Sequence, residues 1–153
     1  MKSILYIIVL VISFTSCSTQ NAFTHFKLSK KEENSLLNLQ NIKITSKENV
    51  DGIFSAIFLN KIDSKRFYEY EYFYIYTYLK DKKDTINFLL NEKVPLQIEE
   101  LEADNRFSNL SAINNKWYSY YLVIFSKQEG DLKLELIRNN TSSTLLTYKK
   151  KSD

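Results

Sequence analysis

The sequence predicts an all-β protein, an antiparallel sandwich of about seven to eight short strands. Three observations support this fold class. From Gln40 onward apolar and polar residues alternate, the repeat of strands whose side chains point to opposite faces. The segments between these runs are rich in Asn and Asp, which favour turns. No helical pattern separates the runs, so a small barrel is the only alternative that we keep.

The length of 153 residues suits one domain, which we place at residues 40–150. The first residues differ from the rest, because Lys2 is their only charge and an unbroken apolar run covers residues 4–12. This run is shorter than the about 20 apolar residues that a membrane-spanning helix needs. We therefore assign residues 1–16 to a secretory signal peptide, with a buried helix of the mature fold as the alternative.

The signal peptide is followed by Cys17, the only cysteine of the chain. A lone cysteine in an exported protein cannot form an intramolecular disulfide, so another use of its thiol is expected. The small residues Thr15 and Ser16 before it resemble a bacterial lipobox, from which Phe14 departs because leucine is usual there. This resemblance implies lipidation of Cys17, with acyl chains such as palmitate anchoring the protein in a membrane. Ser18 after the cysteine, in place of aspartate, implies the outer membrane.

Residues 17–39 are assigned to the lipidated cysteine and a polar tether. Within them, Ser29 and Glu32 have the spacing of a capping box, and leucines follow at positions where a short helix would have them. A short helix and a solvated linker both fit this segment.

Seven alternating or apolar runs, together with a tyrosine-rich segment, account for the expected strands. The runs are "NIKIT" (41–45), "GIFSAIFLN" (52–60), "TINFLLN" (85–91), "VPLQIEEL" (94–101), "KWYSYYLVIFS" (116–126), "DLKLELIR" (131–138) and "STLLTYKK" (143–150). The second is apolar at most positions, which predicts a strand buried on both faces. Pro95 predicts an edge strand or the beginning of a strand, because proline cannot donate to an interior ladder.

The tyrosine-rich segment has a tyrosine at every second position of residues 68–78. We expect a strand over residues 67–79 which, with the run 117–125, occupies the centre of the sandwich. At about 3.3 Å per residue this strand would exceed about 40 Å, which is long for such a domain, so a bend, bulge or overhang is expected. On its other face, Phe73 and the apolar residues after it predict burial, whereas Glu69 and Glu71 predict exposure.

Two interpretations of the tyrosines stay open. In the first, cross-strand aromatic pairs stabilise a half-buried sheet. In the second, exposed rings form a ladder that stacks on a sugar, a peptide or a protein partner. The candidate partner-binding residues are Tyr68, Tyr70, Tyr72 and Tyr74.

Four stretches, "RFYEYEYFYIYTYLKD", "INFLLNEKVPLQIEEL", "NKWYSYYLVIF" and "LKLELIRNNTSSTLLTYKK", resemble small epsilon-proteobacterial lipoproteins. The likeness covers residues 41–150 and contains no catalytic motif. It implies an immunoglobulin-like sandwich on a lipid tether, with a role in surface attachment, and it carries over no functional residue. The chain departs from the usual signature of two cysteines around a tryptophan, because Cys17 precedes the domain and Trp117 falls in a late strand.

The residues needed for common catalytic and cofactor sites are missing from the predicted domain. The only histidine, His25, precedes it, so neither a serine–histidine–aspartate site nor a zinc site is expected. Gly52 and Gly130 are the only glycines, too few for a phosphate-binding loop. The acidic run at 98–105 could hold calcium or a glycosidase pair, but a solvated loop is favoured. We expect no enzyme, cofactor or metal.

Charge and export narrow the choice of partners. Removing residues 1–16 takes away Lys2 and no acid, which lowers the net charge from +3 to +2. With no basic block and a clear export signal, nucleic acid is not expected as a partner. Two classes of function remain: a lipid-anchored binding or adhesion module that presents the aromatic strand to a protein or glycan, and a structural envelope lipoprotein with no ligand of its own.

Overall fold

The computed structural model describes residues 29–46, 49–111, 113–140 and 142–150. The predicted signal peptide, Cys17 and His25 lie outside these residues. The strands are β1 (Leu39–Ser46), β2 (Asn49–Phe58), β3 (Glu71–Leu79), β4 (Ile86–Leu90), β5 (Gln97–Leu101), β6 (Ser119–Phe125), β7 (Leu132–Arg138) and β8 (Ser142–Tyr148). The helices are α2 (Lys30–Asn38) and the short 3-10 helices η2 (Leu59–Lys61) and η3 (Ser108–Leu110).

The strands form two antiparallel sheets, with the orders β1-β2-β3-β6-β5 and β4-β7-β8. The seven strands from β2 to β8 have the arrangement of an immunoglobulin constant-type domain, in which four strands of one sheet face three of the other. Strand β1 extends the larger sheet beyond β2. The predicted all-β, immunoglobulin-like sandwich is therefore confirmed.

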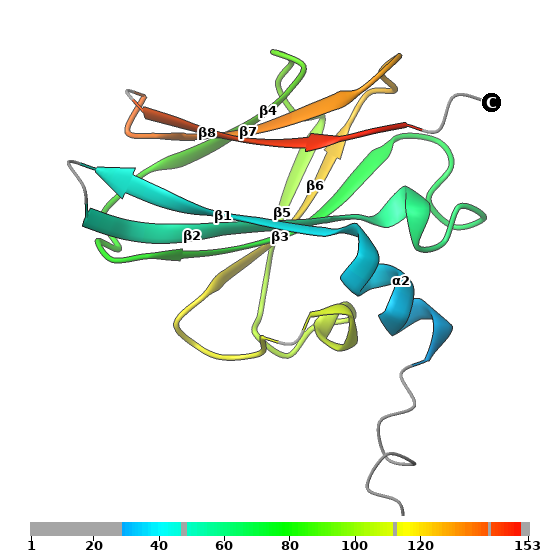
Figure 1. The fold of residues 1–153 in the computed structure, drawn as a ribbon, viewed down its shortest axis with the longest axis horizontal. Helices are drawn as coiled ribbons and strands as arrows, with labels where there is room; N and C mark the ends of the chain where they lie inside the picture. The colour runs from blue at the N-terminus through cyan, green and yellow to red at the C-terminus, as the bar shows by residue number, and fades with distance from the viewer. Residues whose placement is uncertain (1–28, 47–48, 112, 141, 151–153) are drawn as a thin grey trace, which may run out of the picture.

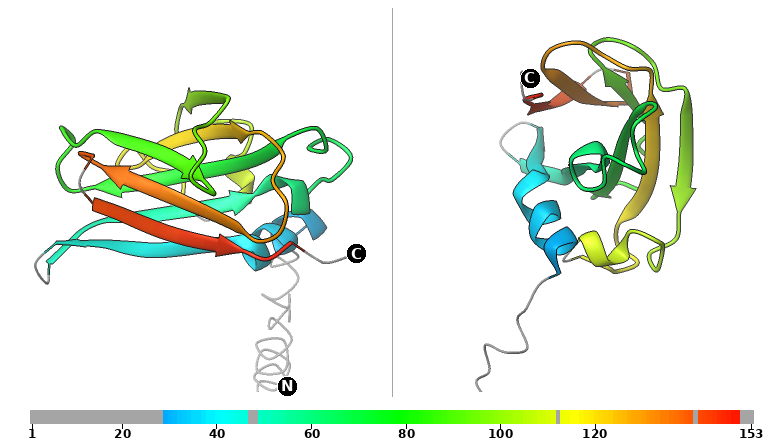
Figure 2. Two further views of the ribbon diagram at one scale, coloured as in Figure 1. Left: turned by 90° about the horizontal axis from the view of Figure 1, so that it is seen from above. Right: turned by 90° about the vertical axis from the view of Figure 1, so that its right-hand side faces the viewer.

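Figure 1 shows three layers: the smaller sheet, the five-stranded sheet, and beneath it α2 with the segment that joins β5 to β6. The two further views in Figure 2 show the same arrangement, with α2 and that segment on the same side of the larger sheet. The larger sheet is thus covered on both faces, and its central strand β3 is buried on both.

The helix α2 belongs to the packed domain. Its capping box is formed, because Glu32 N–H donates to Ser29 Oγ at 3.2 Å and Ser29 N–H donates to Glu32 Oε2 at 2.6 Å. The buried Ser35 hydroxyl donates to the carbonyl oxygen of Leu110 at 2.8 Å, which joins α2 to η3. The helix interpretation is confirmed, and residues 30–39, which we assigned to the tether, are part of the fold. None of the helices in the described ranges is long and apolar enough to cross a bilayer.

The tyrosine-rich strand is shorter than predicted, because it begins at Glu71 instead of residue 67. Its pairing with β2 ends at Phe73. Beyond this point the Asn60 side chain takes the place of a partner strand: Nδ2 donates to the Tyr70 carbonyl at 2.6 Å, and Oδ1 accepts from Tyr72 N–H at 2.8 Å. An amide side chain satisfies one backbone donor and one acceptor, so the ladder stops there.

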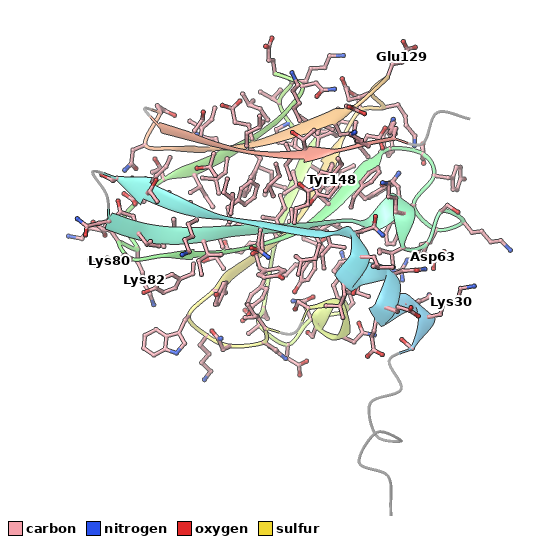
Figure 3. The ribbon with its side chains drawn as sticks, viewed as in Figure 1. Lys30, Asp63, Lys80, Lys82, Glu129 and Tyr148 are labelled. Atoms are coloured by element: carbon pink, nitrogen blue, oxygen red, sulfur yellow. The ribbon has the colours of Figure 1, made fainter. Side chains whose placement is uncertain are left out.

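The space between the two sheets holds the main core. Its residues come from both inner faces and include Phe54, Phe73, Ile75, Phe88, Leu134 and Tyr148. Figure 3 shows Tyr148 between the sheets, where its hydroxyl donates to the Ala56 carbonyl at 2.5 Å. The burial predicted for the apolar face of the strand from Phe73 onward is confirmed.

Several predicted turns use left-handed backbone without glycine. Asn91 and Glu92 have φ of 48° and 67°, and Leu90 and Lys93 exchange both backbone hydrogen bonds across them. Asn139 and Asn140, between β7 and β8, have φ of 51° and 55°. Asparagine tolerates this conformation better than most residues, so the predicted asparagine-rich turns are confirmed in a chain with two glycines.

The sandwich is joined along one side, where β1 lies beside β8. The Gln40 side chain donates to the Thr147 carbonyl at 2.5 Å and accepts from Thr147 N–H at 3.2 Å. The edge strands of the other side are β4 and β5. Pro95 lies just before β5, as predicted for an edge strand.

Candidate functional site

The structure separates the four candidate tyrosines. Tyr68 is 70% exposed and lies before β3, and Tyr70 and Tyr72 are half-buried. Tyr74 is fully buried. A buried ring cannot contact a partner while the layer above it stays in place, so only Tyr68, Tyr70 and Tyr72 can belong to a contact surface.

The later tyrosines form a second core under α2 and the β5–β6 segment. Tyr74 and Tyr76 pack with Tyr120 of the neighbouring strand β6, with ring centroids 6.4 Å and 6.3 Å away. Phe107, from the covering segment, lies 5.2 Å from Tyr74. These are the cross-strand aromatic pairs of the first interpretation, so this half of the ladder stabilises the fold.

Burial keeps these phenols protonated and gives a prediction for alkaline pH. Desolvation raises the pKa of Tyr76 to about 12 and also raises those of Tyr74 and Tyr148, all from an ordinary value of 10.0. The folded state therefore binds these protons more tightly than the unfolded state. The contribution of Tyr76 to stability is fully present below pH 10 and is lost as the pH rises through about 12. When the urea midpoint of unfolding is measured at pH 8, 10, 11 and 12, it should fall steadily from pH 10 to pH 12. Tyr76→Phe should show a shallower fall, and a midpoint constant to pH 12 would contradict the assignment.

The structure contradicts the exposure predicted for Glu71, which is fully buried, whereas Glu69 is exposed as predicted. Glu71 Oε1 accepts from Lys150 Nζ at 2.5 Å and from Gln128 N–H at 3.2 Å. Lys127 Nζ lies 3.9 Å from Oε2. A buried carboxylate needs such partners. It ties the beginning of β3 to the end of β8 and to the β6–β7 loop.

A second aromatic site, which the sequence analysis did not propose, surrounds Trp117. This side chain, the only tryptophan of the chain, is 70% exposed. Its backbone is held in an Asx turn, in which Trp117 N–H donates to Asn115 Oδ1 at 2.9 Å. The buried Tyr120 hydroxyl accepts from Asn115 N–H at 2.9 Å and donates to the Asn115 carbonyl at 3.0 Å. The exposed indole is thus carried by a turn that is fixed to the core.

Trp117 stands at a cleft on the side of the sandwich where β4 and β5 are the edge strands. The cleft is lined by Thr77 and Leu79 of β3, Lys82 and Asp84 of the β3–β4 loop, Ile86 of β4, Glu100 of β5, and Lys116, Trp117, Tyr118, Ser119 and Tyr121 around the beginning of β6. Tyr121 is half-buried and packs edge-on against Phe88, with ring centroids 5.5 Å apart. Burial, and next the nearby Glu100 carboxylate, raise the pKa of its phenol.

The sequence did not predict this site, because Trp117 was expected inside a strand. The structure begins β6 at Ser119, after the Asn115 turn. The two asparagines of "NNKWYS" were the available signal, since Asn favours Asx turns that end a strand pattern. An aromatic residue that directly follows such a turn is a candidate for a surface contact.

The acidic run at 98–105 lies on β5 and the segment after it. Glu99 pairs with Arg106, with Oε2 and Nη2 2.6 Å apart, and Glu100 lines the cleft beside Trp117. In the described ranges no three His, Cys, Asp or Glu side chains are grouped so that they could hold a metal ion.

The strand order of the two sheets gives the chain the architecture of an immunoglobulin-like β-sandwich. No protein-family model matches the chain, and a search of curated proteins finds no match.

Proposed function

We propose that this protein is a lipid-anchored, non-enzymatic binding module of the bacterial cell envelope, held in the outer membrane through Cys17 and binding its ligand in the cleft beside Trp117. The observation that carries the proposal is the 70% exposure of an indole whose backbone is fixed by Asn115 and Tyr120. Large exposed aromatic side chains are enriched in binding surfaces, and a preorganised one loses little entropy on binding.

The position of the cleft supports an anchored module. Figure 3 shows Lys82, which lines the cleft, at the end of the sandwich away from Lys30 at the beginning of α2. Cys17 precedes this helix in sequence, so an anchor there would attach at the α2 end. The described chain therefore begins at the end of the domain opposite the proposed ligand site.

A structural envelope lipoprotein without a ligand is the second candidate. The burial of Tyr74 and Tyr76 favours it, because these rings stabilise the sheet and are unavailable to a partner. The two candidates differ in what Trp117 does: a structural lipoprotein has no use for an exposed indole, whereas a binding module loses its contact surface without it.

Lipidation at Cys17 is expected to make the protein incorporate a fatty acid when it is produced in a Gram-negative host. Growth with labelled palmitate, followed by gel electrophoresis of the purified protein, measures this. Cys17→Ala should remove the label and release the protein from the membrane fraction. Label that persists in Cys17→Ala would exclude this site.

The binding proposal is tested by sedimenting the mature protein, in detergent micelles, with envelope fragments of a Gram-negative bacterium. We expect Trp117→Ala to weaken the apparent affinity for the fragments by about tenfold, a loss of about 1.4 kcal/mol, without changing the urea midpoint. The matched comparison is a triple variant in which Tyr68, Tyr70 and Tyr72 become serine. Loss in this triple variant alone would move the binding surface to the tyrosines. Equal binding by all three proteins, or none by the wild type, would favour the structural lipoprotein.

A further inference from the structure

The charges around the Trp117 cleft are balanced, with two lysines and two acids in its lining. Asp84 is already engaged, since Oδ1 accepts from Asn139 Nδ2 at 2.6 Å and Oδ2 lies 3.5 Å from Arg138 Nη1. The side chains of Lys82, Lys116 and Glu100 make no hydrogen bond or ion pair to another residue in the described part of the chain. The cleft therefore offers ammonium donors and a carboxylate acceptor at the same place.

This combination limits the chemistry of a ligand. An anion would be attracted by the lysines but repelled by Glu100 and Asp84. A cation would be attracted by these two carboxylates but repelled by the lysines. A purely apolar ligand would cover charged groups without replacing their hydrogen bonds to water, which is costly. A neutral molecule with many hydroxyl groups avoids both penalties, because each hydroxyl can donate to a carboxylate or accept from an ammonium group.

The aromatic residues add a shape requirement. An exposed indole presents a flat apolar face, and its turn is fixed by Asn115, so a ligand with one flat apolar side fits it best. Leu79 and Ile86 contribute apolar surface to the same cleft. Ser119 and Tyr121, which also line it, carry hydroxyl groups that can both donate and accept a hydrogen bond.

We propose that the cleft binds a neutral saccharide, and that a pyranose ring stacks its C–H face on Trp117 while its hydroxyls donate to Glu100 and accept from Lys82 and Lys116. A pyranose ring combines a flat C–H face with a rim of hydroxyl groups. This inference rests on the proposed binding function and names its ligand class. It assigns Trp117 to affinity and Glu100 to the recognition of hydroxyl groups.

The single tryptophan makes the test specific. When only the indole absorption is excited, all of the intrinsic fluorescence comes from Trp117 and so reports on this cleft alone. The mature lipidated protein in detergent is titrated with the methyl glycosides of glucose, galactose and N-acetylglucosamine and with their trisaccharides. The comparison probes are glucuronate, as an anion, and the peptide triglycine. We expect saturable fluorescence changes with at least one neutral saccharide, stronger with the trisaccharide than with the monosaccharide, and none with the comparison probes.

Variants then assign the contacts, with calorimetry as the readout where the indole is removed. Trp117→Ala should weaken saccharide binding by about tenfold or more, and Trp117→Phe should recover part of it. Glu100→Gln should weaken it by about tenfold, because a hydrogen bond to a charged acceptor is lost. Leu145→Ala, at a 47% exposed residue of β8 outside the cleft, is the matched control and should bind as the wild type does.

The outcomes separate the ligand class from the binding function. Saturation by triglycine or glucuronate but by no neutral saccharide would overturn the assignment of a neutral saccharide and keep a binding cleft at Trp117. Envelope binding that depends on Trp117, without a fluorescence response to any of these probes, would also overturn the saccharide assignment and keep the binding cleft. Saccharide binding that is unchanged in Trp117→Ala and in Glu100→Gln would overturn the site. If Trp117-dependent envelope binding is also absent, the proposed function fails as well.

Discussion

Replacing Gly52 by alanine is expected to destabilise the domain by about 3 kcal/mol, the upper part of the range for an overpacked core. Gly52 lies within β2, between β1 and β3. A Cβ atom there would overlap the backbone carbonyl oxygen of Tyr78 and would lie 3.0 Å from Leu79 Cδ2 and 3.3 Å from Ile44 Cδ1. The carbonyl belongs to a paired strand and cannot rotate away as a side chain can, so β2 and β3 would have to separate. Urea unfolding followed by circular dichroism measures the loss.

Gly130 provides the control for this prediction, because its surroundings are the opposite. A Cβ there would meet no atom within 4 Å, but its φ is 68°, in the left-handed region. Gly130→Ala should therefore cost only about 1 kcal/mol, through backbone strain. Equal losses in the two variants, or a loss at Gly52 below that at Gly130, would show that β2 and β3 can move apart easily.

Replacing Lys150 by methionine is expected to cost about 3–5 kcal/mol, the range measured when one partner of a buried ion pair is removed. Glu71 has a side-chain exposure of 0%, whereas that of Lys150 is 29%. Without Lys150, the carboxylate would lose its nearest counter-charge and keep only the Gln128 N–H donor and the more distant Lys127. The effect is therefore expected to be larger for Lys150→Met than for most substitutions of a half-exposed lysine. Urea unfolding at pH 7 measures it.

Two further variants test whether the buried charge causes that loss. Adding Glu71→Gln to Lys150→Met should restore about 2 kcal/mol, because a neutral amide is less costly to bury than an unpaired carboxylate. Lys127→Met should cost less than about 1 kcal/mol, because this side chain is 50% exposed and its Nζ lies 3.9 Å from the carboxylate. A Lys150→Met protein within about 0.5 kcal/mol of the wild type would exclude a stabilising role for the pair.

The strands were predictable because their signal is local. The pleat places alternate side chains on opposite faces, so one buried face leaves a period-two pattern in the sequence itself. The alternation of Leu132, Leu134 and Leu136 marks β7 in this way. The capping box of Ser29 and Glu32 is equally local, since the two residues that form it are three positions apart. The alternatives of helix and linker stayed open because so short a helix also needs tertiary packing, and the contact of α2 with η3 joins residues far apart in the sequence.

The ends of strands and the exposure of single side chains could not be predicted from alternation, because they depend on particular side-chain contacts. Asn60 ends the ladder of β3 by bonding to Tyr70 and Tyr72 across the β2–β3 loop. Asn115 turns the chain before β6 and so places Trp117 at the surface instead of in the sheet. In both cases one amide side chain replaces a strand partner. The pattern of apolar residues does not predict such a hydrogen bond.

Local patterns in the sequence predicted the sandwich class, the approximate strands and the asparagine-rich turns, because each depends on residues close together in the chain. Packing between distant parts of the chain determines which tyrosines are buried and pairs Glu71 inside the protein. Tyr74 is buried because α2 and the β5–β6 segment cover that face of β3. Glu71 is buried because Lys150, 79 residues further along the chain, supplies its counter-charge. Burial is a property of what packs on a strand, and residues far away in sequence supply that layer.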